Sequence, residues 1–329
     1  GKATICNMGA ELGATTSIFP YDERMATYLR ASERPELAAL ADRFAEHLRA
    51  DDDVAANPEK YFGRVVEIDL STLEPHLVGP HTPDLARPIS EVAAAVASEH
   101  YPELLSSALI GSCTNSSYED VSRAADVARQ ATAHGAKAAT ELLVTPGSEA
   151  IHATIQRDGQ MADLEAVGAN VMANACGPCI GQWRRDKITK GDVNAIVTSF
   201  NRNFPARNDA NPSTMNFIAS PEIVMALGIA GKLTFNPLTD TLKGADGVEF
   251  KLDPPAPAPE VPVDGFVGRG FGYEAPAEDG GGTQVVVDPD STRLQLLSPF
   301  ARWDGNDYDD LQIRVKAQGK CTTDHISPA

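Results

Sequence analysis

Ala108-Leu109-Ile110-Gly111-Ser112-Cys113-Thr114-Asn115-Ser116 places a short apolar run directly before a polar loop that contains a cysteine. We interpret residues 108–110 as a buried strand, because short apolar runs bounded by turn residues are typical of parallel-sheet cores. The segment from Asp120 to His134 has apolar residues at helical spacing and stops at Gly135. The stretch therefore predicts a strand, a cysteine-bearing loop and a covering helix in succession.

The same alternation of strands and helices continues from about residue 89 to about residue 235. We expect further strands at 141–144, 169–172 and 194–200, and helices from Ser148 to Asp158 and from Ser220 to near Gly231. Strands that alternate with helices are typical of parallel sheets. The predicted fold class is therefore α/β, with helices on both faces of the sheet.

The first segment, residues 1–74, differs from this body. It has an alanine-rich helical stretch from Pro35 to Arg49, and an alternating stretch from Val65 to Leu70 that predicts a strand. The Pro-, Gly- and His-rich residues 75–88 then predict a boundary or a long loop.

The last part of the chain predicts a linker and the start of another domain. Asp253 to Gly282 is rich in Pro, Gly and acidic residues with little periodicity, which favours an extended linker. Residues 292–329 regain a globular composition, with a strand-like stretch at Leu311 to Val315, but are too few to form a core alone. Because the sequence starts without Met and ends where no element is complete, we expect it to be the middle of a longer protein.

The 28 Lys and Arg residues against 46 Asp and Glu residues give a formal net charge of -18. This charge repels a phosphate backbone and disfavours nucleic acid as a partner. It also repels a polyanionic small molecule, so an acidic substrate would need a local arginine cluster. No apolar run approaches the roughly 18–20 residues of a membrane span. Five cysteines without a signal peptide favour a reducing compartment over a disulfide framework.

Cys176-Gly177-Pro178-Cys179 is the second cysteine motif. Taken alone, it is typical of a dithiol redox site, a zinc site or an iron–sulfur site. Cys113 makes the redox and zinc sites less favoured, because a dithiol exchanger needs no third cysteine and a structural zinc site needs a fourth ligand nearby. No histidine lies in residues 172–183, and we expect His134 and His152 on helix surfaces. Three thiolates would leave one iron of a four-iron cube open to a substrate oxygen.

The candidate ligands follow predicted strands. Cys113, the loop of Cys176 and Cys179, and Asn201 each come directly after one. Because ligands bind at the carboxyl ends of the strands in open α/β sheets, we expect these three stretches to converge on one crevice.

Arg202 and Arg207 meet the requirement for a local arginine cluster. They lie in the loop after the strand predicted at 194–200, and guanidinium groups bind carboxylates in bidentate fashion, so this pair could clamp one polycarboxylate. Arg184 and Arg185, in contrast, predict an exposed helix face. For Cys6 and Cys321, which belong to the first and last segments, we expect buried, inert thiols.

Five motifs resemble those of the aconitase family, in particular its mitochondrial-type branch, and occur in the family's order. They are Cys6–Glu11, Gly111–Ser116, Ala175–Cys179, Asn201–Asn211 and Cys321–Ser327. Each motif alone is weak, but the set is specific and the resemblance spans essentially all 329 residues. The resemblance implies a hydro-lyase that interconverts citrate and isocitrate through cis-aconitate on a 4Fe-4S cluster.

The resemblance also implies a role for each matching residue. It makes Cys113, Cys176 and Cys179 the cluster ligands, places Asn7 and Asn201 beside the cluster, gives catalytic roles to Glu11 and Asn201, and assigns Arg202 and Arg207 to the substrate carboxylates. In family terms, residues 1–74 are the end of the second domain, 75–262 the third and cluster-bearing domain, 263–290 the linker, and 291–329 the start of the swivelling fourth domain.

The first domain and most of the last lie outside this sequence, so we expect the segment alone to hold a cluster imperfectly and not to turn over citrate. The resemblance further implies a tricarboxylate as small-molecule partner, no membrane or nucleic-acid partner, a monomeric full-length protein, and a location in the bacterial cytoplasm or the mitochondrial matrix.

Other hypotheses stay open at this point. Homoaconitase shares the motifs, and isopropylmalate isomerase does so too but keeps its swivelling domain on a separate chain. An RNA-binding aconitase relative is disfavoured by the charge of -18. A plain dithiol oxidoreductase would use Cys176 and Cys179 without Cys113.

Overall fold

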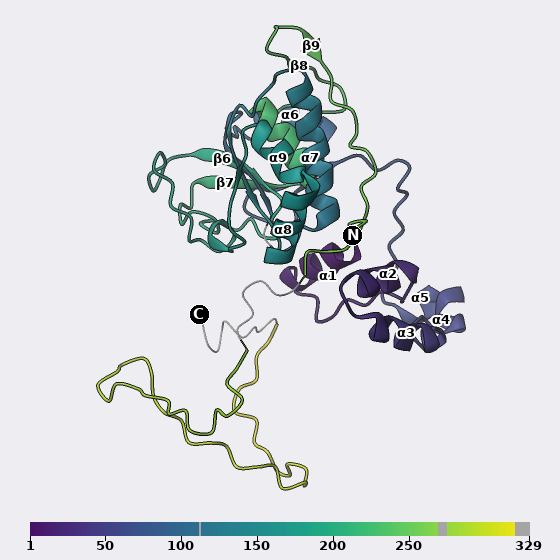
Figure 1. The fold of residues 1–329 in the computed structure, drawn as a ribbon, viewed down its shortest axis with the longest axis vertical. Helices are drawn as coiled ribbons and strands as arrows, with labels where there is room; N and C mark the ends of the chain where they lie inside the picture. The colour runs from purple at the N-terminus through teal and green to yellow at the C-terminus, as the bar shows by residue number, and fades with distance from the viewer. Residues whose placement is uncertain (112, 269–274, 320–329) are drawn as a thin grey trace. The chain divides into compact units, whose positions relative to one another are not determined.

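The computed structural model describes residues 1–111, 113–268 and 275–319 (Figure 1). The chain divides into two compact units, Gly1–Tyr273 and Glu274–Ala329. Helices and strands belong to the first unit, and the described residues of the second unit form neither. None of the helices in the described ranges is long and apolar enough to cross a membrane.

The first part of unit one is helical. Its elements are α1 (Lys2–Glu11), α2 (Glu23–Ala31), α3 (Pro35–Arg43), the 3-10 turn η1 (Ala45–His47), α4 (Asp52–Ala56) and α5 (Pro58–Tyr61). The predicted helical stretch from Pro35 to Arg49 is thus present as α3 and η1.

A seven-stranded sheet forms the body of the unit, in the order β2-β1-β7-β6-β3-β4-β5. Its strands are β1 (His76–Val78), β2 (Ala86–Pro88), β3 (Leu105–Gly111), β4 (Glu141–Thr145), β5 (Asn170–Val171), β6 (Asn194–Thr198) and β7 (Thr214–Ile218). The helices of this part are α6 (Ile89–Ser98), α7 (Tyr118–Ala133), α8 (Glu149–Asp158), α9 (Gln160–Ala166) and α10 (Pro221–Ala230), and a small hairpin follows as β8 (Leu242–Lys243) and β9 (Glu249–Phe250).

The five strands from β7 to β5 are parallel, and β1 and β2 add an antiparallel edge. This arrangement confirms the predicted α/β class. Side chains alternate between the two faces of the sheet, as the strand pleat requires. Ala108 and Ile110 of β3 join the large core that includes residues of α7, α9 and α10, whereas Leu109 joins a smaller cluster with Cys179 and Phe200. Loops and the 3-10 turn η2 (Gly177–Cys179) supply the cover of the second face, so the prediction of helices on both faces is wrong for the described residues.

Serine caps define the starts of two helices, α7 and α8, and the sequence predicts the second of them. The Ser117 hydroxyl accepts from the Asp120 N–H and the Asp120 carboxylate accepts from the Ser117 N–H, a capping box at the start of α7. The Ser148 hydroxyl accepts from the Ile151 N–H at 3.1 Å and starts α8 as predicted. Ser220 holds the cap position of α10, but its hydroxyl makes no capping hydrogen bond.

The chain order of the strands creates a switch point in the sheet. From β3 the chain moves to β4 and β5 on one side, and it then returns to form β6 on the other side of β3. Open α/β sheets bind ligands at such a point, outside the carboxyl ends of the two strands. The loops that follow β3 and β6 are therefore the place to look for a site.

Two predicted strands are wrong. Residues 65–70 are irregular, and Val65, Val66, Ile68 and Leu70 are between 47% and 78% exposed. Residues 311–315 are likewise irregular and exposed. Alternation alone does not make a strand, because a single strand needs a partner for its backbone groups, and neither stretch has one in the described parts of the chain.

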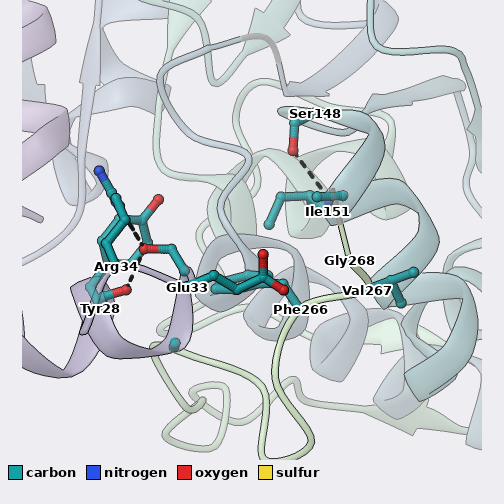
Figure 2. A pocket seen from close by; sticks show the side chains of 11 residues that line it. Tyr28, Glu33, Arg34, Ser148, Ile151, Phe266, Val267 and Gly268 are labelled. Atoms are coloured by element: carbon teal, nitrogen blue, oxygen red, sulfur yellow. Dashed lines mark hydrogen bonds between the residues drawn. The ribbon is translucent and has the colours of Figure 1, made fainter. Parts of the chain in front are cut away.

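The first part of the predicted linker is attached to the body of the unit. The N–H of Asp253 donates to Gln130 of α7 at 2.8 Å, and the N–H of Val267 donates to the Thr154 hydroxyl of α8 at 3.0 Å. The ring of Phe266 lies edge-on to Tyr28 and helps to line a cavity of about 270 Å³ between α2 and α8 (Figure 2). Residues 253–267 thus form a strap and not a free spacer.

Candidate functional site

The loops after β3 and β6 are joined by hydrogen bonds at the switch point. The Ser199 hydroxyl accepts from the Gly111 N–H at 2.9 Å, and the Asn115 side-chain amide donates to the Ser199 carbonyl at 2.9 Å. Ser199 is fully buried. These bonds fix the loop that carries Cys113 against the loop that carries Asn201.

Two side-chain amides join two of the predicted ligand thiols. Asn7 Nδ2 donates to Cys113 Sγ at 3.7 Å, and Asn201 Nδ2 donates to Asn7 Oδ1 at 2.7 Å. The Cys179 thiol donates to Asn201 Oδ1 at 3.8 Å. Cys113, Asn7, Asn201 and Cys179 therefore form one continuous chain of polar contacts, which we call the amide bridge.

Helix α1 brings Asn7 to this place. The Thr4 hydroxyl donates to Asn115 Oδ1 at 3.2 Å, and the Thr114 hydroxyl donates to Asn7 Oδ1 at 2.9 Å. Thr4 and Asn7 are three residues apart and so lie on the same face of the helix. Glu11 ends α1, but its side chain lies outside the described part of the structure, so its catalytic role stays a prediction.

The cysteines differ in exposure. Cys113 and Cys176 are exposed, whereas Cys179 is only 6% exposed. Cys6 is half-buried, so the expected full burial is wrong, and its thiol points to the Ser17 carbonyl at 3.9 Å. Cys321 lies outside the described residues. Within the described ranges, no three His, Cys, Asp or Glu side chains are grouped closely enough to hold a metal ion.

The local fold of the cysteine motif explains the burial of Cys179. The N–H of Cys179 donates to the Cys176 carbonyl at 2.9 Å and closes the 3-10 turn η2. This turn places Cys179 in the apolar cluster with Leu109 and Phe200. The Asn208 side chain then donates to the Pro178 carbonyl at 2.9 Å, which holds the cysteine loop against the arginine loop.

The arginine loop, residues 201–211, contains strained backbone on both sides of Arg207. Ala206 and Ala210 have φ values of 62° and 58°, a region that costs non-glycine residues about 1–3 kcal/mol and that clusters at ligand sites. Arg207 Nε is buried and has no hydrogen-bond acceptor among the described residues. A buried donor without an acceptor is unfavourable in a protein alone and suits a site for an anionic group. Arg202 is half-buried in the same loop.

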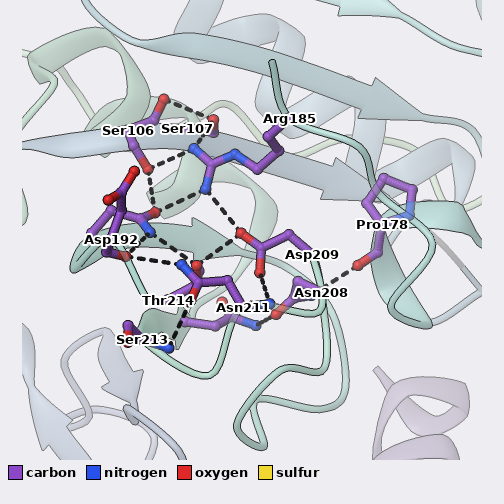
Figure 3. A network of polar contacts seen from close by, with 12 residues as sticks. Ser106, Ser107, Pro178, Arg185, Asp192, Asn208, Asp209, Asn211, Ser213 and Thr214 are labelled. Carbon is purple, nitrogen blue, oxygen red and sulfur yellow. Dashed lines mark hydrogen bonds and ion pairs between the residues drawn. The ribbon is translucent and has the colours of Figure 1, made fainter. Parts of the chain in front are cut away.

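Arg185 does not lie on the exposed helix face that the sequence predicts for it. Residues 181–187 form no helix, and the Arg185 side chain is only 7% exposed. Its guanidinium donates to Asp209 Oδ2 at 3.2 Å, to Asn194 Oδ1 at 2.8 Å and to Ser106 Oγ at 2.8 Å (Figure 3). Sequence reasoning missed this residue because its partners come from three distant segments and no local pattern marks them.

Two further polar groups lie around the arginine loop. The pKa of Asp192 is lowered by hydrogen bonds from the N–H and the hydroxyl of Thr189. The pKa of His81 is lowered by burial, which disfavours the charged form of this side chain. The loop of His81 is attached to the site, because the Asn203 side chain donates to the Thr82 carbonyl at 2.9 Å.

The donor chemistry of the amide bridge suits a soft metal group. Thiolates are the preferred ligands of iron–sulfur clusters, and the bridge already contains two thiols with amides beside them. Cys176 lies one 3-10 turn before Cys179 and is open to solvent. The type of donor therefore suits an iron–sulfur cluster, although the three thiols are not gathered into a metal-binding group within the described ranges.

Comparisons with known proteins show the family of the chain. The model of the "Aconitase family (aconitate hydratase)" matches residues 1–231. The chain is 54% identical to the mitochondrial aconitate hydratase of Gracilaria gracilis, 54% identical to the probable mitochondrial aconitate hydratase of Dictyostelium discoideum and 52% identical to the mitochondrial aconitate hydratase of Saccharomyces cerevisiae. In each comparison all of this chain is covered but only 41% or 42% of the relative. The chain therefore belongs to the aconitase family.

Proposed function

We propose that this chain is the cluster-bearing part of an aconitate hydratase, which interconverts citrate and isocitrate through cis-aconitate. The amide bridge carries the proposal, because it gathers residues from four separate stretches at the switch point of the sheet. The relatives at 52–54% identity are named aconitate hydratases and supply the reaction. Their names also support a mitochondrial matrix location.

Cys113, Cys176 and Cys179 would hold the 4Fe-4S cluster. When bound, such a cluster supplies a Lewis-acid iron that makes the substrate hydroxyl a better leaving group. The chain's own contribution is orientation. Asn7 donates to the Cys113 sulfur and is itself held by Asn201, and N–H bonds to a ligand sulfur also tune the electronic properties of a cluster.

Arg202 and Arg207 would bind the carboxylates of the substrate. The net charge of -18 repels a tricarboxylate, so binding needs guanidinium groups that are already in place. The buried Nε of Arg207 is such a donor. Burial also excludes water from the ion pair that would form, which strengthens it. Glu11 would complete the hydrogen-bond network, and the full-length protein would work as a monomer.

An activity assay tests the proposal. The full-length protein, treated with iron and sulfide without oxygen, is expected to hydrate cis-aconitate. The reaction is measured as the loss of the ultraviolet absorbance of the conjugated double bond. An iron chelator should remove the activity and added ferrous iron should restore it. Residues 1–329 alone should show no turnover. Activity confined to a longer or branched homologue of cis-aconitate would instead identify a homoaconitase or an isopropylmalate isomerase.

Arg207→Lys is expected to raise the KM for citrate and isocitrate by about 10–100-fold, because it keeps the charge but loses the bidentate fork, a loss of about 1.5–3 kcal/mol. The measurement is steady-state kinetics on the full-length protein. Arg184→Lys is the matched control, since Arg184 is exposed and should leave KM unchanged. An unchanged KM in Arg207→Lys would remove Arg207 from the substrate site.

A further inference from the structure

We propose that Arg185 and Asp209 are a positioning pair that fixes the cysteine loop and the arginine loop relative to each other. The importance of these two loops rests on the proposed function, but the contact between them does not. The motifs of the sequence assign no role to either residue, although Asp209 lies within the Asn201–Asn211 motif, and Arg185 was expected to lie on an exposed helix face.

The position of the pair explains how it could act on both loops. Arg185 follows the cysteine motif along the chain, and Asp209 follows Arg207. The partners of Arg185 mark the amino ends of the strands, because Ser106 and Ser107 belong to the start of β3 and Asn194 starts β6. The cysteine motif and Asn201 follow the carboxyl ends. Both loops therefore cross the same face of the sheet from the carboxyl ends to the amino ends of the strands. The Arg185–Asp209 pair joins them near the amino ends.

The contacts are those of a specific site and not of a surface ion pair. The side chains of Arg185 and Asp209 are 7% and 3% exposed. Nη1 of Arg185 donates to two acceptors and Nη2 to two more, at 2.8 to 3.2 Å, and the guanidinium plane lies 4.5 Å from the centre of the Trp183 ring. Asp209 Oδ2 also accepts from the Thr214 hydroxyl at 2.8 Å, and Oδ1 accepts from the Asn211 N–H at 3.0 Å.

The fork of donors makes arginine necessary at this position. An arginine can bond four acceptors in one plane and stack on an indole at once, whereas lysine offers a compact charge without the fork. Breaking such a buried pair on one side leaves an uncompensated charge, which is strongly destabilising. The cost should fall on the two loops, since both partners belong to them and not to the helical core.

The burial of Cys179 gives a direct readout of whether the two loops stay in place. Cys179 is buried under this loop arrangement, while Cys113 and Cys176 are exposed. In the cluster-free full-length protein, iodoacetamide should label Cys113 and Cys176 rapidly and Cys179 slowly, as peptide mass spectrometry can quantify. Arg185→Met should increase the labelling rate of Cys179 by about 100-fold through local opening. The rates for Cys113 and Cys176 should change little.

Further variants separate coupling from general loss of stability. Asp209→Asn should increase the Cys179 rate by about 10-fold, and the double variant should label no faster than Arg185→Met alone, as expected for one shared interaction. Arg185→Lys should not restore the slow rate. Arg129→Met is the matched control, because Arg129 also pairs with two carboxylates but lies on α7 in the helical layer. It should leave Cys179 protected.

Two outcomes would overturn the proposal. One is a wild-type Cys179 rate in folded Arg185→Met or Asp209→Asn protein. The other is an equal increase in Arg129→Met, which would make the effect one of general stability. In active holoenzyme, Asp209→Asn should also raise the KM for citrate. A protein with no hydratase activity but with the expected labelling pattern would refute the proposed function and leave the positioning pair intact.

Discussion

Cys113→Ser in the full-length protein is expected to abolish the brown iron–sulfur absorbance after reconstitution and to reduce hydratase activity below detection. A serine hydroxyl is a poor ligand for the soft iron site that a thiolate binds. The substitution would also remove the sulfur that accepts from Asn7 Nδ2, and so one end of the amide bridge. Visible absorbance, iron content and activity measure the effect together.

The same variant separates two classes of function. A dithiol oxidoreductase that works through Cys176 and Cys179 would keep its exchange activity without Cys113. Cys6→Ser is the matched control, because Cys6 is half-buried and its thiol donates to the Ser17 carbonyl and not to a residue of the amide bridge. It should keep both absorbance and activity. A Cys113→Ser protein with full absorbance would disprove the ligand assignment.

Gly111→Ala is expected to destabilise the chain by more than about 4 kcal/mol, which is exceptional for a single substitution. The φ of Gly111 is 129°, a conformation that residues with a Cβ rarely adopt, and an added Cβ would lie 2.0 Å from the Thr145 carbonyl oxygen of β4. Neither strand can move away without breaking the centre of the sheet. Urea unfolding, followed by circular dichroism, measures the loss.

Gly177→Ala is the control for this prediction. Gly177 lies in the cysteine motif, has no positive φ, and its nearest contact for an added Cβ would be the Gln182 carbonyl at 3.8 Å. The free energy of unfolding of the Gly177→Ala variant should stay within about 1 kcal/mol of the wild-type value. If Gly111→Ala and Gly177→Ala unfold at the same urea concentration, the close approach of β3 and β4 is not as described.

The sequence predicted the body of the fold well because the local signals were strong. The apolar run at 108–110, the cap at Ser148 and the glycine after α10 each act within a few residues. Where the outcome depended on distant partners, the same rules failed. Residues 65–70 alternate correctly but have no strand to pair with in the described chain.

The candidate site shows the same difference between features set by local sequence and features set by distant partners. Cys113 and Asn201 were predictable from their positions after strands, since parallel strands bring such residues to one edge. The order β6-β3 that makes them neighbours is a property of the whole sheet. The Arg185–Asp209 pair was hidden for the same reason, because a buried arginine and a surface arginine look alike until their acceptors are known.

Asn7 gives the amide bridge an architectural consequence. It belongs to the helical residues 1–61, which an irregular stretch separates from the sheet, yet it stands between the thiols of the sheet loops. The proposed reaction centre is therefore composite, and neither segment could supply it alone. A recombination point in the irregular stretch could join two well-folded parts and still lose the centre, unless the incoming helix offers an asparagine at the same place. The helix and the cysteine loops must consequently evolve as one unit.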